Sequence, residues 1–326
     1  MFGFREGLCA QDAMLLLKHK VVQSRKVGVV LGLDLKSAFD RVQHSAILER
    51  MSELGLGKRS YEYVRSFLTG RSAELVAGEY EVGKRGLGCI GTPQGAVISP
   101  MLFNLVMAKV GKRLTREGIG HSIYADDLTL WCVGKGVEET RDTLQRGIDA
   151  IEEELAGTGL ECSHEKSAYV VVGPRSRRWQ DVELRANGGM IPRVKELRVL
   201  GLWLQEARGN GVMLDKLQRK VGAAMQMVRR VASRRRGMKE ESVLRLVQAF
   251  GMSHIAYVAG YLKWGVTEKG KINALIRRIY KAAIGLLACT STEMMERLGV
   301  HNTLEEVIEA QRISQTERLR GSAVGR

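Results

Sequence analysis

Three aspartates stand where short apolar segments are expected to end as β-strands. Asp34 follows the apolar run 29–33, and Asp126 with Asp127 separates the runs 122–124 and 128–133. Carboxylates at the edge of a sheet suit Mg²⁺, a cation that prefers oxygen ligands and keeps several waters. Two such ions about 3.5–4 Å apart can activate an attacking hydroxyl group and stabilise a leaving oxygen. The three residues therefore predict metal-dependent phosphoryl transfer.

A simpler interpretation exists for an isolated Asp-Asp pair, because most such dipeptides form a solvated turn. Here Tyr124, the strand-forming flanks and a second strand-end aspartate favour the metal site. The loop Gly91-Thr-Pro-Gln-Gly95 precedes an expected buried helix. Its glycines allow a base or sugar to approach the backbone, and Gln94 can hydrogen-bond a nucleotide or a template. Without that context the loop would be an ordinary turn.

The elements that must position these residues mix strands and helices in the first half of the chain. Residues 137–155 carry apolar side chains at helical spacing, which predicts an amphipathic helix. Beyond Gly201 the pattern predicts helices almost alone, so we expect an α+β domain followed by an all-α domain. The polar segment from Thr303 to Arg326 is expected to fray. The expected strands are 27–33, 73–77, 122–124, 128–133 and 168–172, and the expected helices are 45–54, 61–68, 101–114, 137–155, 214–232, 240–261 and 268–287.

The charge of the chain is concentrated in one region. The 326 residues include 51 Lys and Arg against 36 Asp and Glu, a net charge of +15. Residues 175–236 hold 16 basic and 5 acidic side chains, which is +11 of that total. Such clustering favours a surface for a polyanion over a uniformly solubilising excess of charge. The alternative is an exposed helix face whose lysines and arginines favour helix formation.

Composition excludes several classes of protein. The longest apolar runs fall short of the roughly 18 residues that a membrane helix needs, so no membrane association is expected. Five scattered cysteines without a CxxC pair argue against a disulfide framework or a zinc cage. These features favour a globular intracellular protein, and they do not distinguish between nucleus and cytoplasm.

Several segments, in a fixed order, carry a resemblance to a known family. Together they resemble the reverse transcriptase domain of non-LTR (LINE-like) retrotransposons over roughly residues 1–290. The segments are Leu33-Asp-Leu-Lys-Ser-Ala-Phe-Asp40 for motif A, Gly91–Pro100 for motif B, Tyr124-Ala-Asp-Asp127 for motif C, Gly159–Lys166 for motif D, Leu197–Leu202 for motif E, Phe2–Gly7 with Gln11-Asp12 for the link between fingers and palm, and Ser253–Tyr257 with Trp264 for the thumb.

The resemblance implies a polymerase palm, in which an antiparallel sheet is flanked by helices, followed by an all-α thumb. The implied domains are a remnant of the fingers and their connection to the palm at 1–26, the palm at 27–205, the thumb at 206–290 and a C-terminal tail at 291–326. Because the upstream strands of the fingers and an endonuclease have no counterpart, we expect an N-terminally truncated domain. Its ability to polymerise is then in question.

The resemblance also implies roles for individual residues. Asp34 and Asp126 would hold two Mg²⁺ ions, which Mn²⁺ could replace, with Asp127 assisting. Phe39 would exclude a ribose 2′-hydroxyl and so select deoxynucleotides, although its position alone would suit a core residue. Asp40 is interpreted as a structural acid at a helix start. The remaining nucleotide contacts would be the carbonyl of Leu35, Gln94, Gly95 and, near the triphosphate, Lys166.

The implied activity is RNA-directed DNA synthesis, with an RNA template, a DNA primer, their hybrid and dNTPs as partners. The backbone of the hybrid would be gripped through phosphates without reading sequence. The alternatives are a remnant that binds nucleic acid without polymerising, and a DNA-templated or RNA-synthesising polymerase, which Phe39 disfavours. The expected basic contacts are Lys216, Arg219, Lys220, Arg229, Arg230, Arg234, Arg235 and Arg236.

Overall fold

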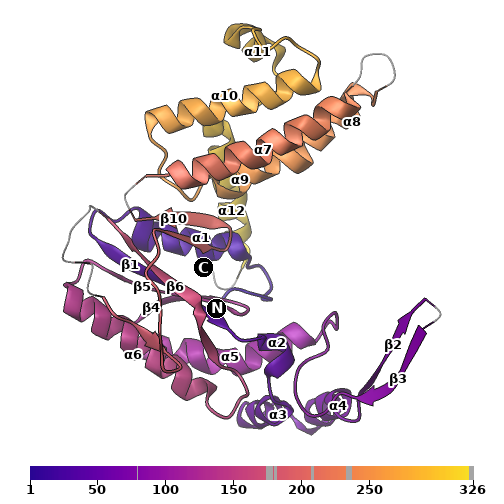
Figure 1. Cartoon of the computed structure of the whole chain (residues 1–326), viewed down its shortest axis with the longest axis vertical. Helices are drawn as coiled ribbons and strands as arrows, with labels where there is room; N and C mark the ends of the chain where they lie inside the picture. Colours follow the sequence, from indigo (N-terminus) through magenta and orange to yellow (C-terminus); the bar gives the residue numbers. More distant parts are fainter. Residues whose placement is uncertain (79, 174–178, 180–181, 207–208, 233–236, 323–326) are drawn as a thin grey trace. The chain divides into compact units, whose positions relative to one another are not determined.

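In the computed structural model the chain forms two compact units (Figure 1). The structure describes all residues except 79, 174–178, 180–181, 207–208, 233–236 and 323–326. We call the first the sheet unit; it comprises Met1–Arg5, Lys26–Val171 and Ser176–Val194. We call the second the helical unit; it comprises Glu6–Arg25, Val172–Arg175 and Lys195–Arg326.

A four-stranded sheet forms the centre of the sheet unit, with strand order β4-β5-β1-β6. Strand β5 pairs antiparallel with both β1 and β4. Strand β1 is almost wholly buried, as its run of Val, Leu and Gly predicts for a central strand. The bounds are β1 Gly28–Leu35, β4 Gly120–Tyr124, β5 Asp127–Val133 and β6 Cys162–Val172.

Two long helices cover the sheet and close its core. Helix α5 (Ser99–Arg116) packs against β4, and helix α6 (Val137–Leu155) packs against β5 and α5. Phe103, Leu114 and Ile148, on these helices, are completely buried among the apolar residues of the strands. This packing fixes the ends of β1, β4 and β5 relative to one another.

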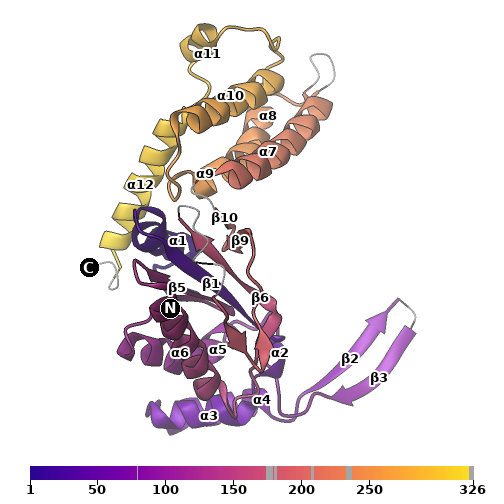
Figure 2. The ribbon, with the colours of Figure 1, turned by 60° about the vertical axis from the view of Figure 1, so that its left-hand side comes forward.

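The other elements of the sheet unit lie beside this core. A hairpin, β2 with β3, extends away from the rest of the unit (Figure 2). The bounds are α2 Ala38–Arg41, α3 His44–Glu53, α4 Lys58–Leu68, β2 Ser72–Ala77, β3 Tyr80–Gly86, β7 Arg185–Ala186 and β8 Gly189–Met190.

Helix α7 (Gly211–Val231) is central to the helical unit, where it packs against α8, α9, α10 and the hairpin strand β10. The hydroxyl group of Tyr257 donates a hydrogen bond to the carbonyl of Leu200 at the hairpin turn, over 2.9 Å. The bounds are α1 Ala10–Leu17, a π-helical turn Lys18–Val22, β9 Glu196–Val199, β10 Leu202–Gln205, α8 Glu240–Val247, a second π-helical turn Gln248–Met252, α9 Ser253–Ala259, α10 Val266–Ala283, α11 Thr292–Leu298 and α12 Leu304–Arg320.

The observed elements agree with most of the sequence prediction, with several differences. The strand expected at 168–172 begins at Cys162, and the hairpin strand β3 was not predicted. The helix expected at 240–261 contains a π-helical turn. The contact units change between Arg25 and Lys26, and β9 and β10 fall in the helical unit, where β10 packs with α7. The predicted domains, with bounds at 26, 205 and 290, stay predictions. Among the described residues, no helix is both long and apolar enough to cross a bilayer.

The expectation that the C-terminal segment frays is wrong for residues 304–320, which form α12. Thr303 and Glu306 form a capping box at its start, where each side chain accepts a hydrogen bond from the backbone N–H of the other residue. Near its end, Arg318 makes a two-armed ion pair with the buried carboxylate of Asp12. A partner some 300 residues away in sequence therefore orders this polar helix, which local composition could not reveal.

Candidate active site

The structure brings two of the predicted carboxylates together. Asp34 lies near the end of β1, and Asp126 lies in the turn between β4 and β5. Strand β5 pairs with both β1 and β4, so the two aspartates belong to neighbouring parts of one sheet. Burial raises the pKa of Asp34, the charge of Lys166 on β6 partly offsets that rise, and the charge of Asp126 adds to it. Two carboxylates that repel each other in this way form a site that a cation would stabilise.

The third predicted carboxylate is placed differently. Asp127 is exposed as the first residue of β5, opposite Tyr124. Across the part of the chain that the structure describes, no three His, Cys, Asp or Glu side chains gather as a metal-binding group. The oxygen donors of Asp34 and Asp126 fit Mg²⁺, whose remaining positions are commonly filled by water and phosphate. The assisting role of Asp127 stays a prediction.

Strand β6 fixes the carboxyl end of β1. The backbone N–H of Asp34 donates to the hydroxyl oxygen of Ser167 over 3.1 Å, and that hydroxyl group donates to the carbonyl of Ser163 over 2.6 Å. Two residues on, the N–H of Lys36 donates to the carbonyl of Glu161 over 2.9 Å. These bonds hold Asp34 beside the segment that carries Lys166.

The N-terminal segment supports the turn that carries Asp126. Ala125 has a φ of 54°, which is uncommon for a residue with a side chain. The backbone N–H of Phe2 donates a hydrogen bond to the carbonyl of Ile123. The buried side-chain amide of Asn104 on α5 donates a hydrogen bond to the carbonyl of Gly3 over 2.8 Å. A Cβ atom on Gly3 would lie 2.6 Å from the backbone nitrogen of Ala125. Only glycine at position 3 therefore allows this approach.

Replacing Gly3 with alanine is expected to displace the Asp126 turn. The activity that the sequence resemblance implies, nucleotide incorporation, should then fall by about 10²-fold, because a shift of about 1 Å at a reacting group has an effect of that size. Single-nucleotide incorporation rates would measure the loss. The matched control is Gly270→Ala, since a Cβ atom there meets nothing within 4 Å. Equal rates for Gly3→Ala and wild-type protein would show that the N-terminal segment does not position the turn.

Phe39 and Gln94 lie in two segments that are bonded to each other. The N–H of Thr92 donates to the carbonyl of Phe39 over 2.8 Å, and the amide of Gln94 donates to the carboxylate of Asp40 over 2.9 Å. The half-buried ring of Phe39 packs at 4.5 Å, between centroids, on the ring of Phe103. Asp40 lies within the first turn of α2, as predicted for a structural acid. The exposed Gly95 has a φ of 86°, a conformation that favours glycine.

Comparison with known proteins assigns this arrangement to a family. Residues 1–204 match the family described as "Reverse transcriptase (RNA-dependent DNA polymerase)". The chain belongs to this reverse transcriptase family. Members of the family generally use divalent metal ions, in agreement with the oxygen-donor pair at Asp34 and Asp126. The sheet unit of the chain, an antiparallel sheet with helices, has the α+β fold expected for a polymerase of this family.

Relatives of this reverse transcriptase chain come from non-LTR retrotransposons. A putative 115 kDa protein of the element R1DM from Drosophila melanogaster is 32% identical over 209 residues, which cover 63% of this chain and 20% of that protein. The RNA-directed DNA polymerase of the element jockey from Drosophila funebris is 26% identical over 180 residues, which cover 54% and 19%. The Pol polyprotein of an R2 element from Nasonia vitripennis is 31% identical over 189 residues, which cover 54% and 17%. The chain thus spans about a fifth of the length of these relatives.

Solved structures similar to this reverse transcriptase chain include telomerase from Candida tropicalis in complex with a fragment of telomeric RNA. The two share 13% identity with a TM-score of 0.45, over 96% of this chain and 53% of that one. Apo telomerase from the same organism gives the same score and identity.

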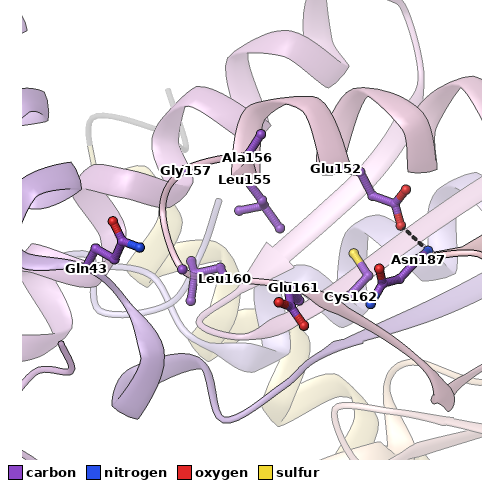
Figure 3. A pocket seen from close by; sticks show the side chains of 10 residues that line it. Gln43, Glu152, Leu155, Ala156, Gly157, Leu160, Glu161, Cys162 and Asn187 are labelled. Atoms are coloured by element: carbon purple, nitrogen blue, oxygen red, sulfur yellow. Dashed lines mark hydrogen bonds between the residues drawn. The ribbon is translucent and has the colours of Figure 1, made fainter.

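A cavity of about 370 Å³ lies in the sheet unit of this reverse transcriptase chain, the unit that also carries Asp34 and Asp126 (Figure 3). Glu161, in its lining, forms ion pairs with Lys36 and Arg41, each at 3.5 Å, beside the end of β1. Burial, assisted by the charge of Glu152, raises the pKa of Cys162 to about 12, so its thiol group stays protonated at neutral pH. None of the predicted site residues belongs to the described lining. The cavity contributes no reactive group to the candidate site.

The predicted basic contacts fall in the helical unit. Arg219, Lys220, Arg229 and Arg230 are exposed on α7. Lys216 is half-buried, and its ammonium group lies 4.5 Å from the ring centroid of Trp203. A cation–π contact of this kind holds Lys216 against the β9–β10 hairpin. Arg234, Arg235 and Arg236 lie outside the described residues.

Three residues that position the site were missed in the sequence. Ser167 holds the end of β1, while Gly3 and Asn104 hold the turn of Asp126. Gly3 lies in the N-terminal segment that resembles the link between fingers and palm, but nothing in that pattern indicates which turn the glycine contacts. Asn104 and Ser167 are single polar residues in apolar elements, which is a weak signal for a buried hydrogen bond.

Proposed function

We propose that this chain is a reverse transcriptase domain that extends a DNA primer on an RNA template by two-metal nucleotidyl transfer. The observation that carries the proposal is the electrostatic interaction between Asp34, near the end of β1, and Asp126, in the turn between β4 and β5. Membership of the reverse transcriptase family and relatives in R1, R2 and jockey elements support it. Because the chain spans about a fifth of the length of these relatives, the polymerase activity of the chain is itself proposed.

Each carboxylate has a defined task in the proposed reaction. Asp34 and Asp126 hold two divalent ions, with Mg²⁺ proposed and Mn²⁺ as a substitute, and Asp127 assists. When bound, the ions supply charge neutralisation at the attacking and leaving oxygens. Asp34 must be ionised to do this, and Lys166 favours that state because its positive charge lowers the pKa of Asp34. The carbonyl of Leu35, on the same strand, is the proposed backbone ligand.

The incoming dNTP is proposed to lie against the segments that carry Phe39 and Gln94. Gly95 exposes its backbone in a turn without a side chain, which permits a close approach by base or sugar. Gln94 already bonds Asp40, so contact with the nucleotide requires it to exchange that partner or to share it. Lys166 is the proposed cation for the triphosphate, because it lies near Asp34 and is exposed.

The exposed basic residues of α7 are proposed to bind the backbone of the RNA–DNA hybrid. Contacts between arginine or lysine and phosphate give sequence-independent affinity that falls with salt, as a polymerase that moves along its template requires. Copying of element RNA at a chromosomal target would place the protein in the nucleus. The proposed contacts are Lys216, Arg219, Lys220, Arg229, Arg230, Arg234, Arg235 and Arg236.

Primer extension tests the proposal. The purified chain is incubated with a DNA primer annealed to RNA, four dNTPs and Mg²⁺, and products are resolved by length. We expect template-dependent extension that EDTA abolishes and that RNase treatment of the template before the reaction prevents. Binding of the hybrid without any extension would instead identify a nucleic-acid-binding remnant and would contradict the proposal.

Replacing Phe39 with alanine is expected to lower the preference for dNTPs over rNTPs by about 10- to 200-fold, the range that one hydrophobic contact usually discriminates. The ring is half-buried on Phe103, and its removal opens the space that we assign to the excluded 2′-hydroxyl group. Steady-state incorporation of dNTP and rNTP would give the ratio. Phe250→Ala, at a ring that is 50% exposed in the helical unit, is the control. An unchanged ratio would assign Phe39 to packing alone.

A further inference from the structure

The loop that carries Gln94 belongs to no helix or strand, so its contacts determine its position. Its first residue, Gly91, has a φ of 79°, and its N–H donates to the carbonyl of Val42 over 2.7 Å. A Cβ atom on Gly91 would lie 2.8 Å from the carbonyl oxygen of Asp40. The loop therefore lies directly against the end of α2 and the segment that follows it.

One side chain of α3 also holds the start of this loop. His44 is the first residue of α3 and is only 6% exposed. Its Nε2 atom lies 2.8 Å from the carbonyl oxygen of Gly91, and its backbone N–H donates to the carbonyl of Cys89 over 3.1 Å. Because a carbonyl oxygen only accepts hydrogen bonds, Nε2 carries the ring hydrogen and donates it.

The second ring nitrogen of His44 distinguishes this contact from ordinary core packing. In the tautomer that donates through Nε2, Nδ1 is an acceptor, and it is buried without a hydrogen-bond partner among the described residues. Burial of an unpaired polar atom is unfavourable. An apolar side chain would fill this position without that cost, so the contribution of the histidine is its hydrogen bond to Gly91.

The anchored part of the loop ends directly before the residues that are proposed to meet the nucleotide. The N–H of Thr92 is hydrogen-bonded, and the carbonyl of Pro93 accepts a bond from the hydroxyl group of Ser99 on α5 over 2.7 Å. Gln94 and Gly95 come next, and both are exposed. A shift at the start of the loop therefore reaches these two residues.

We propose that His44 is a positioning residue for nucleotide binding, which acts by fixing the carbonyl of Gly91 and with it the turn of Gln94. Its contact is with the backbone of the loop, so its effect falls on the affinity for dNTP and not on the chemical step at Asp34 and Asp126. This inference rests on the proposed function, because it concerns the nucleotide that the loop is proposed to bind.

Two substitutions of His44 separate the hydrogen bond from the other effects of replacing the ring. In His44→Gln the amide nitrogen is as many bonds from Cβ as Nε2 is in histidine, so it can donate to the same carbonyl. In His44→Asn the amide nitrogen is closer to Cβ and falls short of that carbonyl. The two variants carry the same functional group and differ in its reach.

Steady-state incorporation of one dNTP on a primed RNA template by the full chain would give KM and kcat separately. We expect His44→Asn to raise the KM for dNTP about tenfold, the effect of losing one buried hydrogen bond, and to leave kcat within about twofold of wild type. His44→Gln is expected to keep the wild-type KM. The matched control is His121→Asn, the same change on β4 at a half-buried histidine whose ring donates to the carbonyl of Ile119.

Thermal unfolding of each variant, followed by circular dichroism, would accompany the kinetics. A merely structural role predicts a lower melting temperature and fewer active molecules, which reduces kcat at an unchanged KM. If His44→Asn does not fold, His44→Leu takes its place, because leucine lacks the donor and fills the apolar surroundings.

Two results would overturn the proposal. One is an unchanged KM for His44→Asn, whether or not kcat falls. The other is a KM for His44→Gln that is as high as that of His44→Asn. If the wild-type chain extends the primer and either result is found, only this inference fails. If the wild-type chain does not extend the primer, the proposed function fails and the inference fails with it.

Discussion

Replacing Asp126 with asparagine is expected to reduce nucleotide incorporation by about 10³-fold or more. The substitution keeps the size of the side chain and removes the charge that acts on Asp34. Without that charge the proposed metal pair loses a ligand, and the loss of several kcal/mol of charge stabilisation corresponds to a reduction of this size. Single-turnover incorporation of one dNTP on a primed RNA template would measure the rate.

The matched control is Asp142→Asn, which makes the same chemical change at an exposed carboxylate on α6 that pairs with Arg141. This control is expected to keep the wild-type rate. Because Asp126 lies in a turn and is only partly buried, the variant should remain folded. Comparable rates for Asp126→Asn and Asp142→Asn would remove Asp126 from the proposed catalytic pair.

The second large effect concerns stability. Replacing Arg318 with alanine is expected to lower the free energy of unfolding of the chain by about 3 kcal/mol, because it leaves a buried carboxylate without its counter-ion. The side chain of Asp12 is only 3% exposed, and Arg318 bonds both of its oxygens. Urea unfolding followed by circular dichroism would measure the change. Arg312→Ala, at an exposed ion pair with Glu309, is the control, with an expected change below about 1 kcal/mol.

The effect of Arg318 should depend on pH. Burial alone would raise the pKa of Asp12, but hydrogen bonds from Arg318, Gln315 and the N–H of Cys9, with the charge of Arg318, outweigh burial and lower it. A carboxyl group whose folded-state pKa is lowered stabilises the fold above its unfolded pKa of about 3.9 and loses that contribution as the pH falls through the folded value. The stability gap between wild type and Arg318→Ala should therefore narrow below about pH 4. A gap that stays constant there would show that packing, and not charge, accounts for the loss.

The sequence predicted the sheet unit well because its elements have strong local patterns. Strand β1 is a continuous apolar run, and α6 has apolar residues at helical spacing. In both elements these apolar residues are the ones buried in the core, so the pattern predicted the element. The positions of Asp34 and Asp126 at strand ends were also predictable, because Asp34 follows one apolar run and Asp126 separates two others. Here the local pattern and the tertiary fold agree.

The features that the sequence did not predict depend on contacts between distant segments. Helix α12 is polar on most faces and depends on Asp12, and the turn of Asp126 depends on Gly3. Packing of α10 against α7 places Arg278 beside Arg229, a pairing that neither segment indicates by itself. Patterns of one segment carry no information on such pairings, because they depend on the packing of whole elements.

The central claim, that Asp34 and Asp126 together hold divalent ions, is tested most directly by Mn²⁺ binding. Electron paramagnetic resonance of free Mn²⁺ would give the number of ions bound per chain in a complex with hybrid, a dideoxy-terminated primer and dNTP. The account predicts two ions for wild-type protein and for Asp142→Asn, and a loss of bound ions for Asp34→Asn and for Asp126→Asn. Equal binding by all four proteins would contradict it.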